Sequence, residues 1–296
     1  DKMGGAIAAI DYMKTQLVSS NSDRLARIET GETVIVGVNK YQAGELSPLM
    51  TGDGGIMIVD PKVEQEQVKR LEAWRSSRNN SAVQSALMKL KEAAATGENI
   101  MPTSIVAARV GVTTGEWAAQ MRDVYGGYRG PTGVGLGQSN MTEKLDDLRS
   151  AVDAVSDKLG RRLKFLVGKP GLDGHSNGAE QIAVRARDCG MDITYEGIRL
   201  TPEEIVTAAH ECAAHVVGLS ILSGSHIALV KELMERMHTT GLSHIPVIVG
   251  GIIPNDDANR LRDMGVARVY TPKDFELNTI MTDIVILAEP KSVALQ

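Results

Sequence analysis

The chain has 296 residues, a formal net charge of −5 and a hydrophobic content of 43%. These values are ordinary for a folded globular protein. Because the chain is acidic and has no run of four basic residues, we expect it to bind neither nucleic acid nor an anionic membrane surface. No apolar stretch approaches the ~20 residues that span a bilayer. We therefore expect a cytoplasmic protein whose two cysteines, Cys189 and Cys212, are free thiols.

The N-terminal part predicts one helix near residues 3–19 and one apolar strand, TVIVGVNKY, at 33–41. A single strand leaves the hydrogen-bonding groups of both its edges without partners, so its sheet must be completed by residues outside this chain. The sequence also begins inside a helical pattern and without a methionine. Both features suggest a piece of a longer protein.

Residues 61–125 follow a helical pattern. Apolar residues recur at helical spacing in two groups: Val68, Leu71 and Trp74, and then Val83, Leu87, Leu90 and Ala94. A segment rich in glycine and proline, residues 125–140, follows this helical arm. We place a domain boundary there.

A further helix is expected after the boundary, with Asn140 and Glu143 in a capping-box arrangement at its start. Its apolar face is formed by Leu145, Leu148, Val152, Val155 and Leu159. This repeat covers only about two heptads, which favours a helix packed on its own domain over a coiled coil.

Strand and helix patterns then alternate five times. Buried parallel strands are expected at 163–168, 215–221, 246–251 and 267–270, and the alternating segment at 192–198 is typical of an edge strand. Gly190 should end the first of the intervening helices, and capping patterns should begin two others, at Thr201-Pro202-Glu204 and at Thr271-Pro272-Asp274. The pattern predicts an α/β fold with a doubly wound, flavodoxin-like sheet of five parallel strands.

Three unusual segments follow predicted strands: KPGLDGHSNG at 169–178, SILSGSH at 220–226, and the pair Gly250-Gly251. Ligands bind beyond the carboxyl ends of strands in open α/β sheets, so these segments should converge. His175 can present a ring nitrogen to a metal, Asp173 can hold the other ring nitrogen, and Lys169 can tune the acid.

The remaining residues of these segments shape a site. Gly174 and Gly178 permit a tight turn and close approach of a ligand, and Gly250 with Gly251 leaves a slot without side chains. Ser220 offers a hydroxyl group at the slot wall, and Leu222 offers an apolar surface.

Other kinds of site lack their patterns. No dinucleotide-binding G-x-G-x-x-G follows a strand, and neither a Walker-type phosphate loop nor a G-x-S-x-G nucleophile elbow is present. Zinc needs three or four protein ligands, whereas this site offers one clear ligand. Four histidines do not have the spacing of metal ligands: His210, His215, His238 and His244. His226 lies near the expected rim of the site, and the sequence leaves its role undecided. A metal with one protein ligand most naturally arrives inside a macrocycle.

These motifs resemble a known domain. DGHSNG at 173–178, SIL at 220–222 and GG at 250–251 are similar to the D-x-H-x-x-G, S-x-L and GG elements of the cobalamin-binding domain that acyl-CoA mutases share with methionine synthase. The resemblance implies that His175 binds cobalt in place of the cofactor's own base, which then enters the slot. Asp173 is implied as the partner of His175, and Lys169 matches a lysine of this family.

The resemblance assigns catalytic roles to Lys169, Asp173 and His175, with His175 as the metal ligand. It also implies a set of cofactor-binding residues: Asp173, Gly174, His175, Gly178, Ser220, Leu222, Ser225, Gly250, Gly251, Tyr270 and Thr271.

The resemblance extends over the whole chain. Residues 1–60 look like the end of a substrate-binding β/α barrel, 61–138 like a helical linker arm and 139–296 like the cobalamin-binding domain. Asn39 and Tyr41 are implied at the barrel mouth. Segments such as KPGLDGHSNGAEQIA and RVYTPKDFEL are most similar to the ethylmalonyl-CoA mutase branch of the family.

That branch implies an isomerase that uses adenosylcobalamin to interconvert ethylmalonyl-CoA and methylsuccinyl-CoA through radicals, with this chain supplying the cobalamin-binding part and inactive alone. It implies three partners: an acyl-CoA bound by the rest of the barrel, a second copy in a homodimer, and a G-protein chaperone that loads the cofactor. Methylmalonyl-CoA or isobutyryl-CoA mutase is the nearest alternative. Non-catalytic alternatives are a corrinoid carrier or sensor, and a flavodoxin-like module that binds FMN or nothing.

Overall fold

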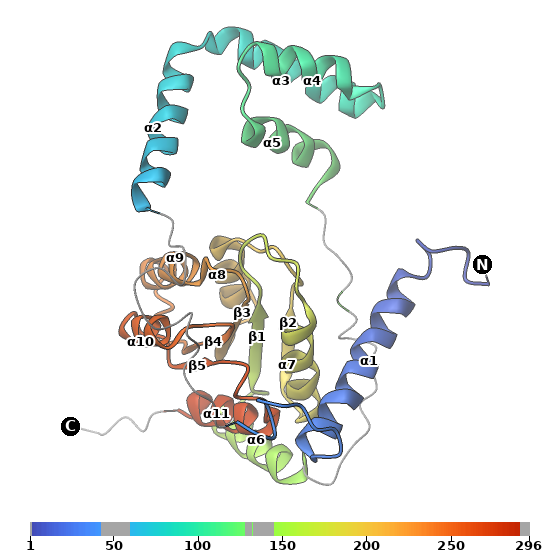
Figure 1. The fold of residues 1–296 in the computed structure, drawn as a ribbon, viewed down its shortest axis with the longest axis vertical. Helices are drawn as coiled ribbons and strands as arrows, with labels where there is room; N and C mark the ends of the chain where they lie inside the picture. The colour runs from blue at the N-terminus through green and yellow to red at the C-terminus, as the bar shows by residue number, and fades with distance from the viewer. Residues whose placement is uncertain (1, 43–59, 128–131, 133–144, 291–296) are drawn as a thin grey trace. The chain divides into compact units, whose positions relative to one another are not determined.

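The computed structural model describes residues 2–42, 60–127, 132 and 145–290 (Figure 1). The chain divides into two compact units, one made of Asp1–Gly44 with Arg129–Gln296 and the other of Glu45–Tyr128.

The first unit contains a parallel sheet that, among the described residues, has five strands in the order β2-β1-β3-β4-β5. The strands are β1 (Lys164–Gly168), β2 (Asp192–Tyr195), β3 (Val216–Ile221), β4 (Val247–Gly251) and β5 (Arg268–Tyr270). This is the flavodoxin-like strand order, so the predicted fold is confirmed. The alternating strand β2 lies at an edge, as its pattern predicts.

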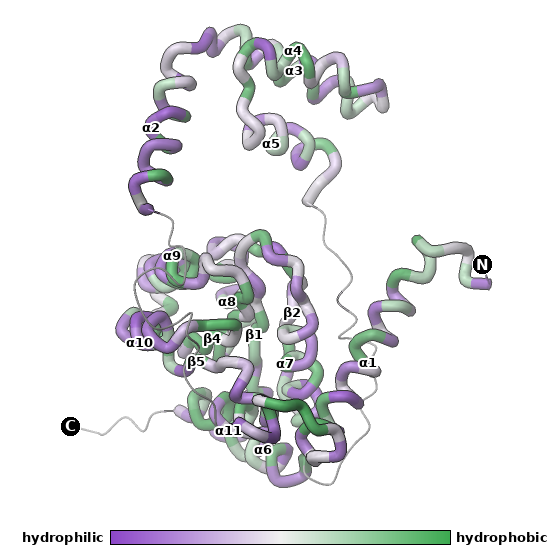
Figure 2. The backbone as a smooth tube through the Cα atoms, viewed as in Figure 1, coloured by the Kyte–Doolittle hydropathy of each residue, from purple (hydrophilic) through white to green (hydrophobic). Residues whose placement is uncertain are grey.

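Helices cover both faces of the sheet (Figure 1). One face packs against α6 (Asp146–Leu159), α7 (Asn177–Asp188) and α11 (Leu277–Ala288), and the other against α8 (Pro202–Glu211), α9 (His226–Thr239) and α10 (Asn255–Asp263). Successive side chains of a strand point to opposite faces, so Phe165 and Val167 enter the first core and Leu166 the second. In Figure 2, β1 and β4 are coloured as hydrophobic, as expected for strands that are buried on both faces.

Helix boundaries follow local chemistry in most places. The Thr201–Glu204 capping box forms, with the Glu204 amide donating to Thr201 Oγ1 at 3.1 Å and the Thr201 amide donating to Glu204 Oε2 at 2.7 Å. Gly190 follows α7 with φ +88°, a conformation that glycine adopts at little cost. The two cysteines are free, as predicted.

The helix start predicted at Thr271 is wrong. Asp274 accepts from both the amide and the hydroxyl group of Thr271, but these contacts close a turn and no helix follows directly. The chain stays non-helical until α11 begins at Leu277, because Glu276 has extended backbone angles. Hydrogen bonds of capping-box type therefore do not by themselves propagate a helix.

The helix α6 packs on its own domain, as expected for its short apolar repeat. Leu148, Val152 and Val155 are buried in the core beneath the sheet. The capping pair predicted at Asn140 and Glu143 lies outside the described residues.

The N-terminal segment differs from its prediction. A helix exists, but α1 spans Ile10–Glu29 and packs against α7 (Figure 1). The strand predicted at 33–41 is wrong, because these residues form turns with one isolated bridge between Val36 and Lys40. Among the described residues no strand pairs with this segment, and the Asn39 side chain satisfies backbone groups instead. Its amide group donates to the carbonyl oxygens of Ile28 and Thr33, both at 2.8 Å.

The second unit is a helical arm, which confirms the helical prediction for residues 61–125. Its described helices are α2 (Pro61–Ser77), α3 (Asn80–Thr96), α4 (Ile100–Arg109) and α5 (Thr114–Tyr125). The predicted apolar face of α3 is buried, including Val83 and Leu90 at 0% exposure. By contrast, α2 is largely hydrophilic along its length (Figure 2). No helix among the described residues of either unit has the length and apolar character required to cross a membrane.

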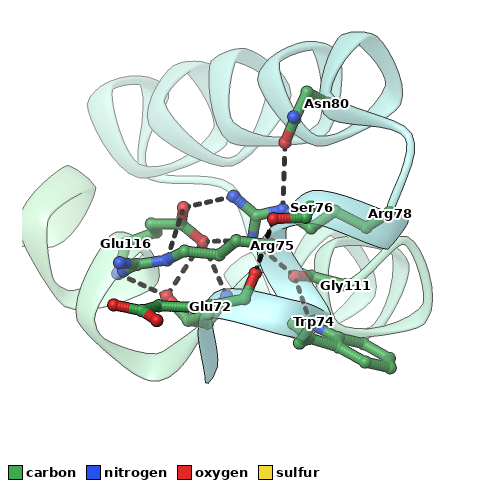
Figure 3. A network of polar contacts seen from close by, with 9 residues as sticks. Glu72, Trp74, Arg75, Ser76, Arg78, Asn80, Gly111 and Glu116 are labelled. Atoms are coloured by element: carbon green, nitrogen blue, oxygen red, sulfur yellow. Dashed lines mark hydrogen bonds and ion pairs between the residues drawn. The ribbon is translucent and has the colours of Figure 1, made fainter. Parts of the chain in front are cut away.

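A network around Glu116 ties α2 to α5 within the arm (Figure 3). The Glu116 carboxylate accepts from Arg78 Nη1 at 2.7 Å and from Arg78 Nη2 at 2.5 Å, and it also closes a capping box with Thr113. Trp74 Nε1 donates to the Gly111 carbonyl oxygen at 3.1 Å in the same network. The hydrogen bonds from Arg78 outweigh the effect of burial and lower the pKa of Glu116 to about 2.

We expect the arm to lose stability in acid. Because the pKa of Glu116 is depressed in the folded state, its contribution is complete above its ordinary value of 4.5 and is lost as the pH falls toward about 2. Both tryptophans of the chain, Trp74 and Trp117, lie in the arm, so tryptophan fluorescence reports on its unfolding alone. At pH 7, Glu116→Gln should lower the urea midpoint by roughly 0.5–1 M. The variant should also flatten the decline between pH 5 and pH 3, and an unchanged acid profile would contradict this assignment.

Candidate functional site

The three segments singled out from the sequence meet at the carboxyl ends of adjacent strands β1, β3 and β4. Lys169 Nζ lies 3.4 Å from the Ser220 carbonyl oxygen, which joins the first segment to the second. Ser220 pairs with Gly250 in the register of β3 and β4. The expected convergence is therefore what the fold produces.

A chain of polar contacts leads from the interior to the surface of the first segment. Lys169 is fully buried at 0% exposure, and its Nζ lies 2.7 Å from Asp173 Oδ2. The other carboxylate oxygen, Asp173 Oδ1, accepts from the His175 amide at 3.0 Å and lies 2.6 Å from His175 Nδ1. The Asp173 side chain is 8% exposed, whereas the His175 side chain is 79% exposed. A buried pair thus holds an imidazole ring that faces outward.

The charge state of Asp173 determines how the ring is held. Burial alone would raise the pKa of Asp173, but hydrogen bonds from Lys169 and from His175 outweigh burial and hold this pKa well below its usual range. The carboxylate is therefore ionised at neutral pH and can only accept hydrogen bonds. His175 Nδ1 must carry the proton, and in the neutral ring the lone pair of Nε2 is free. That nitrogen is a suitable ligand for a metal.

Lys169→Met tests the buried pair. Removing one partner of a buried ion pair leaves the other charge uncompensated, so we expect the sheet unit to lose about 3–5 kcal/mol of stability. The matched control is Lys164→Met at the start of β1, the strand that Lys169 directly follows, because Lys164 pairs with Asp192 at 2.6 Å and the Asp192 side chain is 47% exposed. That change should cost no more than about 1 kcal/mol. Amide exchange of β1 measures both, and equal losses would contradict the buried role of Lys169.

A cavity of about 510 Å³ lies beside these segments, over the face of the sheet that carries Phe165 and Ile248. Of the residues predicted to bind a cofactor, these line it: Gly178, Ser220, Leu222, Gly250, Gly251, Tyr270 and Thr271. Five of the predicted site residues are not part of its lining, namely Lys169, Asp173, Gly174, His175 and Ser225. The site therefore has two parts, the outward imidazole and the cavity.

The paired glycines have different physical roles. A Cβ atom on Gly251 would lie 1.9 Å from the Ile221 carbonyl oxygen, so strand packing alone requires glycine there. A Cβ atom on Gly250 would have no neighbour closer than 4.0 Å, and one on Gly178 none closer than 3.9 Å. Both line the cavity, so side chains at these two positions would occupy its space.

His226, which sequence reasoning left open, supports the second segment. It is 4% exposed, and its Nε2 lies 2.9 Å from Asp257 Oδ2. Its Nδ1 lies 3.3 Å from the Ser223 carbonyl oxygen. Together the two contacts join the turn at 223–225 to α10, so His226 holds the loop and is not part of the cavity lining.

The Tyr270 side chain has a structural partner, the carboxylate of Asp283. The Tyr270 hydroxyl group donates to Asp283 Oδ2 at 2.8 Å, and burial together with this carboxylate raises the pKa of Tyr270.

Within the part of the chain that the structure describes, no three His, Cys, Asp or Glu side chains gather as a metal centre. The available metal chemistry therefore rests on a single ligand, His175.

Sequence reasoning missed one wall of the cavity. Six lining residues come from α1 and the turns that follow it: Asn21, Arg24, Leu25, Ile28, Ile35 and Val38. They precede the other lining residues by more than 100 positions in the sequence, and none belongs to a recognisable motif. The one available signal is the apolar character of 33–41, which by itself indicates a strand.

Two parts of the chain match known protein families. A family model described as methylmalonyl-CoA mutase matches residues 1–127, and one described as B12 binding domain matches residues 163–274. The ethylmalonyl-CoA mutase of Cereibacter sphaeroides is 64% identical over 294 residues, which cover 99% of this chain and 45% of that protein. The ethylmalonyl-CoA mutase of Methylorubrum extorquens is 52% identical over 290 residues, or 97% of this chain and 42% of that protein.

A methylmalonyl-CoA mutase of Cereibacter sphaeroides is less similar, with 34% identity over 278 residues, 92% of this chain and 39% of that protein. The chain spans less than half the length of these three curated relatives.

Proposed function

We propose that this chain belongs to the cobalamin-dependent acyl-CoA mutase family, binds adenosylcobalamin and supplies the cobalamin-holding part of an ethylmalonyl-CoA mutase. The observation that carries the proposal is the outward imidazole of His175, held through Nδ1 by a buried carboxylate next to a glycine-lined cavity. One free ring nitrogen matches a metal that brings its other ligands with it.

The site fits such a group in two respects. His175 Nε2 is accessible, and Asp173 and Lys169 hold the ring in one tautomer and orientation. The cavity is largely apolar, with Gly178 and Gly250 leaving room for a planar base that has left the metal. Adenosylcobalamin, when bound, supplies the radical chemistry for rearranging a carbon skeleton.

Each segment of this chain has a separate task in the proposal. In this proposal His175 would bind the metal, Asp173 accepts a hydrogen bond from the Nδ1–H group of His175, and Lys169 keeps Asp173 ionised. The cavity residues, with Gly174 and Ser225 in the adjoining turns, hold the cofactor's tail and exclude water from it. Residues 1–60 end the substrate barrel, 61–138 form the linker arm and 139–296 form the cobalamin domain. The separate family matches at 1–127 and 163–274 support the boundary before the cobalamin domain.

The substrate assignment follows from similarity. The two ethylmalonyl-CoA mutases are 64% and 52% identical to this chain, whereas the methylmalonyl-CoA mutase is 34% identical. We infer that the whole enzyme interconverts ethylmalonyl-CoA and methylsuccinyl-CoA. Assaying it on ethylmalonyl-CoA, methylmalonyl-CoA and isobutyryl-CoA tests this, and a preference for either of the last two would overturn it.

Three further proposals concern the setting of the whole enzyme, and the family resemblance supports them. It works in the cytoplasm, it forms a homodimer, and a G-protein chaperone loads its cofactor. Light scattering of the whole enzyme checks the dimer, and cofactor loading with and without a nucleotide-binding partner checks the chaperone.

Titration of this chain with adenosylcobalamin is the most direct test. We expect a visible spectrum in which the cofactor's own base is displaced and a protein imidazole takes its place. A chain that binds FMN, or no coloured ligand, would overturn the proposal. Methyl transfer to the bound corrinoid without mutase activity in the whole enzyme would instead identify a corrinoid carrier.

A further inference from the structure

The wall of the cavity that α1 and the following turns provide has a chemistry of its own. We propose that this wall binds the nucleotide tail of the cofactor and that Arg24 contacts the anionic phosphodiester of that tail. The inference rests on the proposed function and adds a binding residue from outside the cobalamin-binding domain.

Polar contacts with low exposure hold α1 in place on α7. Lys14 Nζ lies 2.6 Å from Glu180 Oε1, and Glu180 is only 2% exposed. The Gln181 side chain donates to the Val18 carbonyl oxygen at 3.1 Å, and Arg185 Nη2 lies 3.0 Å from Glu29 Oε2. These contacts are distributed along α1 from Lys14 to Glu29. The helix is therefore a fixed wall of the cavity.

The turns after α1 extend this wall. Asn39 draws them back onto the helix end through its contacts with Ile28 and Thr33, and its Oδ1 accepts from the Ile35 amide at 2.8 Å. This arrangement presents Ile28, Ile35 and Val38 to the cavity. Their apolar surfaces suit the face of a heterocyclic base.

Charge identifies the phosphodiester contact. Among the described residues that line the cavity, only Arg24 and Asp274 carry a full charge at neutral pH. The Asp274 carboxylate already accepts two hydrogen bonds from Thr271. Arg24 shows no ion pair to any described carboxylate, so its guanidinium group is available to a ligand. A phosphodiester in a largely apolar cavity needs such a donor, and arginine matches its geometry.

Comparing two corrinoids isolates the contact with the tail. Adenosylcobalamin carries the phosphodiester, ribose and base, whereas adenosylcobinamide lacks all three. Arg24→Gln should weaken adenosylcobalamin binding by roughly tenfold, as expected for one charge-assisted hydrogen bond, and should leave adenosylcobinamide binding unchanged. The matched control is Arg27→Gln, one turn further along α1 and outside the cavity lining, which should change neither affinity.

Amide exchange of α1 provides a second readout that does not depend on the variant. Adenosylcobalamin should slow exchange in α1 of the unsubstituted chain, and adenosylcobinamide should not. Equal adenosylcobalamin affinity in Arg24→Gln and the unsubstituted chain would overturn the role of Arg24. If adenosylcobalamin binding left amide exchange in α1 unchanged, this would overturn the proposal that α1 forms a wall of the site for the tail. Failure of the unsubstituted chain to bind either corrinoid would instead overturn the proposed function, so the two failures are distinguishable.

Discussion

His175→Ala should abolish the spectrum of imidazole-ligated cobalamin and lower the affinity of the chain for adenosylcobalamin by more than about 100-fold. Loss of a residue that only orients a metal ligand typically costs 10–100-fold in metal affinity, and loss of the ligand itself should cost more. The ring is 79% exposed and contacts the fold mainly through Asp173, so its removal should leave the stability of the sheet unit nearly unchanged. Visible spectroscopy during titration measures the effect.

Two companion variants make the His175 prediction specific. Asp173→Asn should lower the affinity by about 10–100-fold, because the ring loses the acceptor that selects its tautomer. His210→Ala, which removes an exposed histidine at the end of α8, should change nothing. Added imidazole should partly restore the ligated spectrum of His175→Gly. An imidazole-ligated spectrum in His175→Ala without added imidazole would refute the ligand assignment.

Alanine substitutions at the two neighbouring glycines of β4 are expected to differ strongly in their effect on stability. Gly251→Ala should destabilise the sheet unit by about 2–3 kcal/mol or more, because its Cβ atom would lie 1.9 Å from the Ile221 carbonyl oxygen and the paired strands would have to separate. Gly250→Ala should be tolerated, because its Cβ atom would meet nothing closer than 4.0 Å. Urea unfolding measures the difference.

A larger side chain at Gly250 should separate binding from folding. Gly250→Leu places a side chain on the same strand face as Ile248, inside the cavity, so the chain should fold but bind adenosylcobalamin at least about 100-fold more weakly. Adenosylcobinamide, which has no tail to place there, should lose much less. Retention of full adenosylcobalamin affinity in this variant would show that the cavity is not the site of the tail.

The sheet was predictable because its signals are local. Apolar runs identify β1, β3 and β4, and the alternation in 192–198 identifies an edge strand. Gly190 follows the end of α7 and Thr201 caps the start of α8, both through contacts within a few residues. The segment at Thr271 shows the limit of local signals, because its side-chain contacts formed without a helix.

Part of the candidate site could likewise be predicted from local signals, and part of it could not. Lys169, Asp173 and His175 lie within seven residues of one another, so their contacts could be anticipated from spacing and from the turn that the glycines permit. Gly250 and Gly251 look alike in the sequence, and only the distance to Ile221 separates a strand-packing role from a cavity role.

The sequence by itself determined the strands and helices of the sheet unit, the helical character of the arm and the turn that presents an imidazole beside an acid. These features depend on residue type and short spacing. Only the tertiary structure decided that α1 packs on α7, that 33–41 forms turns instead of a strand, and that Arg24 faces the cavity. Those outcomes depend on contacts such as Lys14 with Glu180 and Glu29 with Arg185, whose partners are separated by more than 150 positions. No local pattern encodes such contacts, because their energy exists only after the sheet has assembled.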